Sequence, residues 1–416
     1  MSRRATALVL AGLLAALGVA LALTVPWTVL PGADPVVDVG RDFTTGQVAR
    51  EVAFHDAVRP PAYASLVLGL VVSAVLGLTP LGGRLVRAVA RPLGGGWVWQ
   101  VLLGTLALGV VGRLVTLPLD ARSEVVLRRY DLSTQTWGSW AVDVAKGIGV
   151  GAGLTALVLL AAVGAARRLP RIWHLVAAPL VALLVVGGSF AYPVVVEPVF
   201  NRFEPLAVGQ LREDLLALAD RDGVPVEDVL VADASRRTTA LNAYVSGFGG
   251  TRRIVVYDTL LREATPAEVR LVVAHELGHA KERDVLVGTL LGALGAAAAV
   301  VVLALLLSWG PLLRRSGADG PGDPRVIALV LLLAGVGTLL LGPVTNVVSR
   351  KVEARADVHA LGLTCDAATF VDSQRRLATT NLSDLDPNPL AFALFATHPS
   401  SPQRIALARE HERLRC

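Results

Sequence analysis

The sequence is unusually apolar for its length. Of its 416 residues, 53% are hydrophobic and 18% are charged, and the mean hydropathy is +0.58. A soluble domain averages about 25% charged residues, so the composition indicates a membrane protein. With only two cysteines, Cys365 and Cys416, a disulfide framework and a cysteine-based zinc site are excluded. The net charge of +5 comes without a basic block among aromatic residues, so we expect membrane-flanking charge and no nucleic-acid partner.

Seven uncharged runs are long enough to cross the roughly 30 Å hydrocarbon core as helices. They are Ala5–Ala33, Pro60–Gly83, Pro92–Gly112, Gly147–Ala166, Ile172–Val196, Val285–Leu313 and Val326–Ser349. The first run follows Arg3 and Arg4 but is too long for the apolar core of a signal peptide, so we interpret it as a span. The sequence therefore predicts a mainly α membrane protein with seven transmembrane helices.

Two larger polar segments, Glu197–Asp284 and Arg350–Cys416, remain outside the spans. Two spans separate them, so both lie on the same membrane face. Together they are about the size of one ordinary domain. We predict a five-helix membrane domain over residues 1–197 and a small α+β domain over residues 198–416, which includes a transmembrane hairpin over 285–349.

The first polar segment contains signals for local structure. Residues 209–222 fit a helix that stops at Gly223, and residues 229–232 fit a short strand. Residues 240–247 and 253–258 fit two further strands, joined as a hairpin by residues 248–251. A small sheet of this kind can offer an exposed edge to an extended peptide.

The stretch Ala264–His279 begins with a clear helix start. Thr265 is a suitable N-cap, Pro266 suits the first helical position, and Glu268 completes a capping box. The spacing therefore predicts a helix that continues through the histidines at the end of the stretch.

The same helix carries the pattern H-E-x-x-H. His275 and His279 lie one turn apart on one face, so both imidazoles can reach a single zinc ion. Glu276, next to the first histidine, is suited to act as general base. The alternative is an ordinary amphipathic helix with two surface histidines and no metal. A third ligand elsewhere in the sequence would favour the zinc site over this alternative.

The membrane hairpin indicates where the third ligand lies. The H-E-x-x-H helix ends six residues before Val285, roughly 9 Å along a helix, and Glu353 follows the seventh span almost at once. The hairpin therefore closes the 74-residue gap between His279 and Glu353. Two histidines and one carboxylate leave a fourth position open for water, which is typical of catalytic zinc.

Several motifs resemble those of one family, the integral-membrane CAAX prenyl endopeptidases (type I CAAX proteases). The first is Ser349-Arg-Lys-Val-Glu-Ala-Arg-Ala-Asp357, which follows a span as in the family. The others are Pro198-Val-Phe-Asn-Arg-Phe-Glu-Pro-Leu206, Asn242-Ala-Tyr, Gly247-Phe-Gly, Arg253-Ile-Val-Val-Tyr-Asp-Thr-Leu-Leu261, Thr397-His-Pro, Pro402-Gln-Arg-Ile405, and Gln135-Thr with Trp140, Asp143 and Lys146. Gln403 departs from the pattern, because the family usually has an acidic residue there.

The resemblance implies a gluzincin-type zinc-peptidase domain at one membrane face, with one Zn2+ per chain. It implies the metal ligands His275, His279 and Glu353 and the general base Glu276. It also implies that Asp357 orients a ligand imidazole. The alternative is that Asp357 is a surface carboxylate without a role in the site.

Three further roles come from the same resemblance. His398 would donate to the tetrahedral oxyanion, although a solvent-facing loop histidine is the alternative. Asn242 would face the substrate beside the edge strand, or cap a turn. Arg404 would pair with carboxylates near the site or hold the C-terminal segment, and we favour the second role. The remaining histidines are interpreted as non-ligands, namely His55, His174, His359 and His411.

The predicted function is a membrane-embedded zinc metalloendopeptidase that cleaves membrane-associated or lipidated polypeptides. The alternatives are a quality-control protease that resembles HtpX, a type with about four spans, and a non-catalytic membrane scaffold of the same fold. We expect a monomer with a peptide or protein substrate at the lipid bilayer, in a bacterial cell membrane.

The side of the membrane that carries the zinc site stays open. The resemblance implies the cytoplasmic side. The short loops on the opposite face, however, are rich in arginine, and the positive-inside rule would make that face cytoplasmic. These residues are Arg3, Arg4, Arg84, Arg87, Arg91, Arg167, Arg168, Arg171, Arg314, Arg315 and Arg325.

Overall fold

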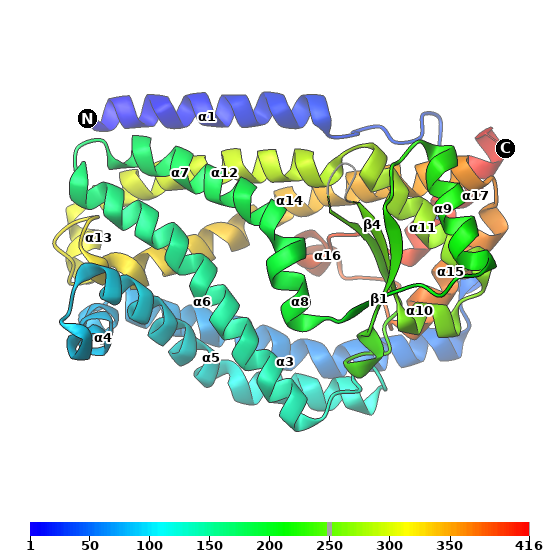
Figure 1. Cartoon of the computed structure of the whole chain (residues 1–416), viewed down its shortest axis with the longest axis horizontal. Coiled ribbons are helices and arrows are strands. Elements are labelled where there is room, and N and C mark those ends of the chain that lie inside the picture. The colour runs from blue at the N-terminus through cyan, green and yellow to red at the C-terminus, as the bar shows by residue number, and fades with distance from the viewer. Residues whose placement is uncertain (248–251, 416) are drawn as a thin grey trace.

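The computed structural model describes residues 1–247 and 252–415 (Figure 1). Within these residues, seven helices have the length and hydropathy to cross a membrane, which confirms the predicted fold class and number of spans. They are α1 (Arg3–Thr24), α3 (Thr45–Gly77), α5 (Trp97–Arg129), α6 (Trp137–Arg168), α7 (Trp173–Ala191), α12 (Asp284–Leu307) and α14 (Ile327–Thr364).

The helix ends differ from the apolar runs for local reasons. α1 ends at Thr24 because the following residues include Pro26 and the Pro31-Gly32 pair, which do not continue a helix. α12 ends at Leu307, and the chain restarts as α13 (Gly310–Arg315) with Pro311 in its first turn. α14 runs for 38 residues, well past the predicted span, and so carries Glu353 on the same continuous helix.

The two ends of the molecule are different in character (Figure 1). One end holds the N-terminus, α13 and α4 (Pro80–Ala90), a short helix between α3 and α5. The other end holds the sheet with α9 (Gln210–Asp222), α11 (Pro266–Lys281), α15 (Ala367–Thr380) and α17 (Ser401–Arg415). The two polar segments therefore lie together, as the parity of the spans predicts.

The sheet at this end has four strands within the described residues, in the order β1-β2-β4-β3. β2 (Asp228–Ala232) and β4 (Arg253–Tyr257) pair in parallel, whereas β1 (Phe203–Pro205) and β3 (Ala243–Ser246) pair antiparallel with their neighbours. The sequence did not indicate β1, which is three residues long and includes a proline. The predicted turn over residues 248–251 lies outside the described residues. β3 is an edge strand, and it packs beside α11.

A hydrophobic core lies between the sheet, α9 and α11. Leu215 of α9, Ile254 of β4 and Val273 and Leu277 of α11 are all fully buried in this cluster. Gly223 ends α9 in the left-handed conformation with φ 73°, which is the stop that the sequence predicts. This core fixes one face of α11 and leaves the other face for the histidines.

Short elements complete the chain. The transition from α7 to the end that holds the sheet is a π-helical turn, η2 (Tyr192–Val196), followed by α8 (Glu197–Phe200). Such π turns often occur at functional sites. The remaining elements are α2 (Val39–Asp42), η1 (Arg91–Leu93), η3 (Ala234–Arg236), α10 (Asp258–Glu263), η5 (Pro324–Val326) and α16 (Pro389–Phe395).

Candidate metal centre and active site

Helix α11 begins as the sequence predicts. The Thr265 hydroxyl accepts the Glu268 N–H, and the Glu268 carboxylate accepts the Thr265 N–H at 2.7 Å, which is a complete capping box. Glu268 also accepts a hydrogen bond from Nε of Arg376 on α15. Burial opposes ionisation of Glu268, but the Arg376 and Thr265 hydrogen bonds outweigh it and lower its pKa. The start of the helix is thereby fixed to α15.

Three potential metal ligands converge between α11 and α14. Nε2 of His275 lies 3.2 Å from Nε2 of His279 and 3.2 Å from Oε2 of Glu353, and Nε2 of His279 lies 3.6 Å from Oε1 of Glu353. Donor atoms about 2.0–2.1 Å from a tetrahedral zinc ion are separated by about 3.3 Å. The observed spacing is therefore compatible with one small cation held by all three side chains.

Two features of this cluster call for a cation. Oε2 of Glu353 is buried and forms no hydrogen bond with any residue that the structure describes. The two imidazole Nε2 atoms face each other, although a neutral imidazole has only one N–H to donate. A metal ion would satisfy the orphaned oxygen and both nitrogen lone pairs, so the residues present fit a metal.

His275 is oriented by Asp357 and Arg404. Nδ1 of His275 lies 2.9 Å from Oδ1 of Asp357, whose side chain is fully buried. Arg404 on α17 donates to both oxygens of that carboxylate, with Nε 2.9 Å from Oδ2. Because a carboxylate only accepts, the His275 proton lies on Nδ1 and the Nε2 lone pair is free for a metal. Arg404 thus pairs with a carboxylate of the site, which is the alternative to the structural role that we favoured from the sequence.

His279 has an equivalent partner that the sequence analysis missed. Its Nδ1 lies 2.9 Å from Oδ2 of Asp284, the first residue of α12, and Arg355 of α14 donates to the other oxygen of Asp284. Arg283 adopts the left-handed conformation, with φ 57°, and so bends the chain between α11 and α12. This bend lets Asp284 turn back toward an imidazole only five residues earlier. A carboxylate directly before a predicted span was the available signal.

The remaining predicted residues line a cavity of about 930 Å3 that contains the ligand cluster. Glu276 lies partly buried in its wall, and desolvation raises the pKa of its carboxyl group, against the opposing effect of His275 and His279. Nε2 of His398 lies 3.4 Å from Oε2 of Glu353, so the C-terminal loop reaches the cluster. Asn242, directly before edge strand β3, also lines the cavity.

Two of the histidines that we interpreted as non-ligands, His359 and His174, have hydrogen-bonding partners away from the ligand cluster. His359 contacts Asp222 at 2.9 Å, and Lys281 donates to the other oxygen of the same buried carboxylate. Asp222 thus connects α9 to both helices that carry the metal-binding residues. His174 contacts the hydroxyl of Thr6 at 3.4 Å.

A second group of potential ligands comprises Glu51, His55 and Asp384. Here Nε2 of His55 lies 3.0 Å from the carbonyl oxygen of Leu382, and Arg59 forms an ion pair with Asp384. The His55 imidazole and the Asp384 carboxylate therefore already have protein partners. The group therefore connects α3 to the segment after α15.

Comparison with known proteins agrees with this geometry. Residues 62–202 match the family model described as CAAX prenyl protease N-terminal, five membrane helices, and residues 205–412 match peptidase family M48. An uncharacterized metalloprotease of Bacillus subtilis, YhfN, is 34% identical over 73% of this chain and 72% of its own length. CAAX prenyl protease 1 of Saccharomyces cerevisiae is 27% identical over 81% of this chain and 76% of its own. The crystal structure of S. mikatae Ste24p has the same fold, with a TM-score of 0.79 over 97% of this chain and 98% of that one, at 21% identity.

The fold and these matches define an integral-membrane metallopeptidase. The chain belongs to peptidase family M48, with a membrane half of the CAAX prenyl protease type. The predicted family, fold class and enzyme class are thereby confirmed. The chain is a multi-pass membrane protein, and its similarity to the Bacillus protein supports a bacterial membrane.

Proposed function

We propose that this protein is a zinc endopeptidase whose single zinc ion is held by His275, His279 and Glu353. The observation that carries the proposal is the convergence of their donor atoms at 3.2–3.6 Å around an orphaned carboxylate oxygen. Two histidines and a carboxylate leave one position open, which is the arrangement of a catalytic site. A bound zinc ion would supply Lewis acidity that activates water and polarises the scissile carbonyl.

The side chains of this chain have separate tasks in the proposed reaction. Glu276 accepts the proton from the attacking water and passes it to the leaving amine. His398 donates a hydrogen bond to the oxyanion as it forms. Asn242 and the edge strand β3 bind the extended peptide beside the helix, since β3 has a free edge within the described sheet. Asp357 holds the His275 ring in place through Nδ1.

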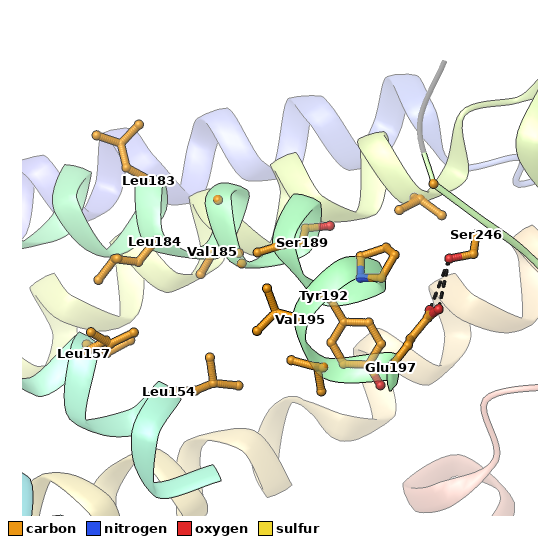
Figure 2. Close-up of a pocket in the computed structure, with 18 of the residues that line it drawn as sticks. Leu154, Leu157, Leu183, Leu184, Val185, Ser189, Tyr192, Val195, Glu197 and Ser246 are labelled. Atoms are coloured by element: carbon orange, nitrogen blue, oxygen red, sulfur yellow. Dashed lines mark hydrogen bonds between the residues drawn. The ribbon is translucent and has the colours of Figure 1, made fainter. Parts of the chain in front are cut away.

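A groove of about 870 Å3 supports a membrane-associated substrate (Figure 2). It runs between α6, α7 and η2, and its walls are mostly aliphatic, as Leu154, Leu183 and Val195 illustrate. At one end lies Glu197, whose carboxylate accepts a hydrogen bond from the Ser246 hydroxyl of β3.

The groove adjoins the catalytic cavity. Val245, Gly247 and Val285 line both. The aliphatic walls of the groove suit an apolar polypeptide segment or a lipid chain. We therefore propose membrane-associated or lipidated polypeptides as substrates, and the names of the CAAX prenyl protease relatives agree with a lipidated one.

The proposed division of the chain is a membrane domain over residues 1–197 and a catalytic domain over residues 198–416. The end of the spanning segment at Phe200 supports it, because the sheet begins at once with β1. We also propose that the chain acts as a monomer, since one chain supplies every residue of the proposed site.

Metal analysis of the purified full chain tests the proposal. We expect one zinc per chain in the wild type, and loss of both zinc and peptidase activity in Glu353→Gln. Glu263→Gln is the matched control, because this carboxylate is exposed on α10 and has no side-chain partner among the described residues. Full zinc content in Glu353→Gln would contradict the ligand assignment. Loss of activity in the control would point to a defect of folding.

A further inference from the structure

The membrane face opposite the catalytic cavity carries a one-sided charge. We call it the arginine face and define it as residues 1–4, 78–96, 167–172 and 308–326. These segments contain eleven arginines and no lysine, against two acidic residues, Asp319 and Asp323. The segments meet at the end of the molecule that holds the N-terminus, α4 and α13 (Figure 1).

Most of these guanidinium groups have no acidic partner. Arg325 forms ion pairs with both Asp319 and Asp323, and so uses the only two carboxylates of the face. Arg3 donates to Ser308 and Arg167 to the carbonyl of Gly322. The other eight arginines form no side-chain hydrogen bond or ion pair within residues 1–247 and 252–415. Such a surface attracts anions, and the attraction is not cancelled internally.

Helix α4 shows how this charge is displayed. One side of α4 is buried, with Val86 and Ala90 fully enclosed, while Arg84 and Arg87 are exposed on the other side. α4 packs this apolar side against α5 and connects the spans α3 and α5. The exposed Arg84 and Arg87 therefore lie at the membrane boundary, at the level of the phospholipid headgroups.

Arg87 also lines a cavity of about 680 Å3 within the arginine face. The cavity lies where α4, the start of α5, the end of α6 and the loop before α14 meet. Its lining includes Trp97, Trp173 and Arg167, whose guanidinium stands 5.6 Å from the centre of the Trp97 ring. Asp319, Asp323 and Arg325 also line it; Arg325 forms ion pairs with both carboxylates, and the three arginines against two aspartates leave the lining with a net charge of +1. A guanidinium group suits a phosphate, and tryptophan is typical of the headgroup region.

We propose that this cavity binds the headgroup of an anionic phospholipid. Arg87 and Arg167 pair with the phosphodiester, and the indole rings of Trp97 and Trp173 contact the glycerol region above the acyl chains. Charge complementarity selects an anionic lipid, because Arg87 has no partner in the described protein. The position at the ends of membrane helices selects a lipid over a soluble anion. The proposal concerns a site separate from the peptidase centre and independent of the proposed catalytic function.

Tryptophan quenching by brominated lipids tests the proposal on the full chain reconstituted in vesicles. The probes are brominated phosphatidylglycerol and brominated phosphatidylcholine, each diluted into unbrominated phosphatidylcholine. Four of the seven tryptophans lie at this end of the molecule, so a local enrichment of brominated lipid there lowers the tryptophan fluorescence measurably. We expect stronger quenching by the anionic probe in the wild type.

The Arg87→Gln substitution should reduce that preference about fivefold, and the double variant R87Q/R167Q should abolish it. Because Arg87 has no partner in the described chain, the single variant does not threaten folding. The matched control is R50Q/R122Q, two exposed arginines near the catalytic face, which should keep the preference. Equal quenching by both probes, or a preference that survives R87Q/R167Q, would overturn the proposal. So would displacement of the anionic probe by millimolar inorganic phosphate, which would identify a soluble-anion site.

Discussion

Nδ1 of His279 lies 2.9 Å from Oδ2 of Asp284, and Arg355 of α14 holds the other oxygen of that carboxylate. His275 has the same arrangement with Asp357 and Arg404. Nδ1 of each histidine of the H-E-x-x-H pattern thus contacts a carboxylate, and that carboxylate accepts a hydrogen bond from a guanidinium group. In both cases the carboxylate fixes the proton on Nδ1 and turns Nε2 toward Glu353.

Asp284→Asn should weaken zinc binding about 10–100-fold, because the amide no longer fixes the tautomer and charge of the His279 ring. Competition with a chelator of known affinity measures this directly, without reference to activity. Asp220→Asn on α9, an exposed carboxylate at the catalytic end, is the matched control and should leave the affinity unchanged. Unchanged zinc affinity in Asp284→Asn would show that the contact does not orient the ligand.

Gly278 lies on the side of α11 that packs against α14, and a methyl group there would contact the His359 side chain. A Cβ on Gly278 would stand 3.1 Å from both Cβ and Cδ2 of His359, whose ring is held by Asp222. Gly278→Ala gains about 1 kcal/mol of helix propensity, but overpacking costs about 1–3 kcal/mol. We therefore expect a net loss of unfolding free energy. In a His359→Ala background the same change should become stabilising, and a loss of equal size in both backgrounds would refute the contact as its cause.

Asp42 should make stability depend on pH at the acid end. Burial opposes its ionisation, but hydrogen bonds from Arg409 and Arg375 prevail and lower its pKa below the ordinary value of 3.8. A carboxyl group with a lowered folded-state pKa stabilises the fold above its unfolded pKa and loses this effect as the pH falls.

The variant that tests this is Asp42→Asn. It should lower the free energy of unfolding by about 2 kcal/mol at neutral pH, since two guanidinium groups lose their partner. The difference from the wild type should shrink as the pH falls below about 4. Thermal unfolding of both proteins between pH 3 and 7 measures it, and a difference that stays constant over this range would exclude the assigned ion pairs.

The arginine face predicts the orientation in the membrane. Short loops rich in arginine stay in the cytoplasm, so the catalytic cavity should lie on the other side. In a Cys416→Ser background, Cys365 on the catalytic end is exposed and should react with a membrane-impermeant maleimide in intact cells. In Asp319→Cys, made in a background that lacks both native cysteines, the thiol should be protected from this reagent. Labelling with the reverse pattern would place the catalytic cavity in the cytoplasm.

Sequence reasoning reached the features that depend on local spacing. The capping box at Thr265, the two histidines one turn apart and the stop at Gly223 depend only on neighbours along a helix. Glu353 could be inferred from a distance, because the membrane hairpin returns the chain to its starting face. The expected positions of these residues could therefore be stated without coordinates.

Other features depend on how helices cross. The ion pair between Asp284 and Arg355 requires the bend at Arg283 and the packing of α12 beside α14. The bidentate contact of Arg404 with Asp357 requires α17 to approach α14 at one point. No spacing rule encodes such crossings, so these contacts became visible only in three dimensions.

The most direct test of the catalytic assignment is the Glu276→Gln variant, assayed on a membrane-associated peptide together with its zinc content. The proposed roles predict a full zinc complement, because this substitution leaves the three ligands intact, and a loss of activity of roughly 10²–10⁴-fold. Glu263→Gln, assayed in parallel, should retain both zinc and activity. Cleavage by Glu276→Gln at the wild-type rate would contradict the account.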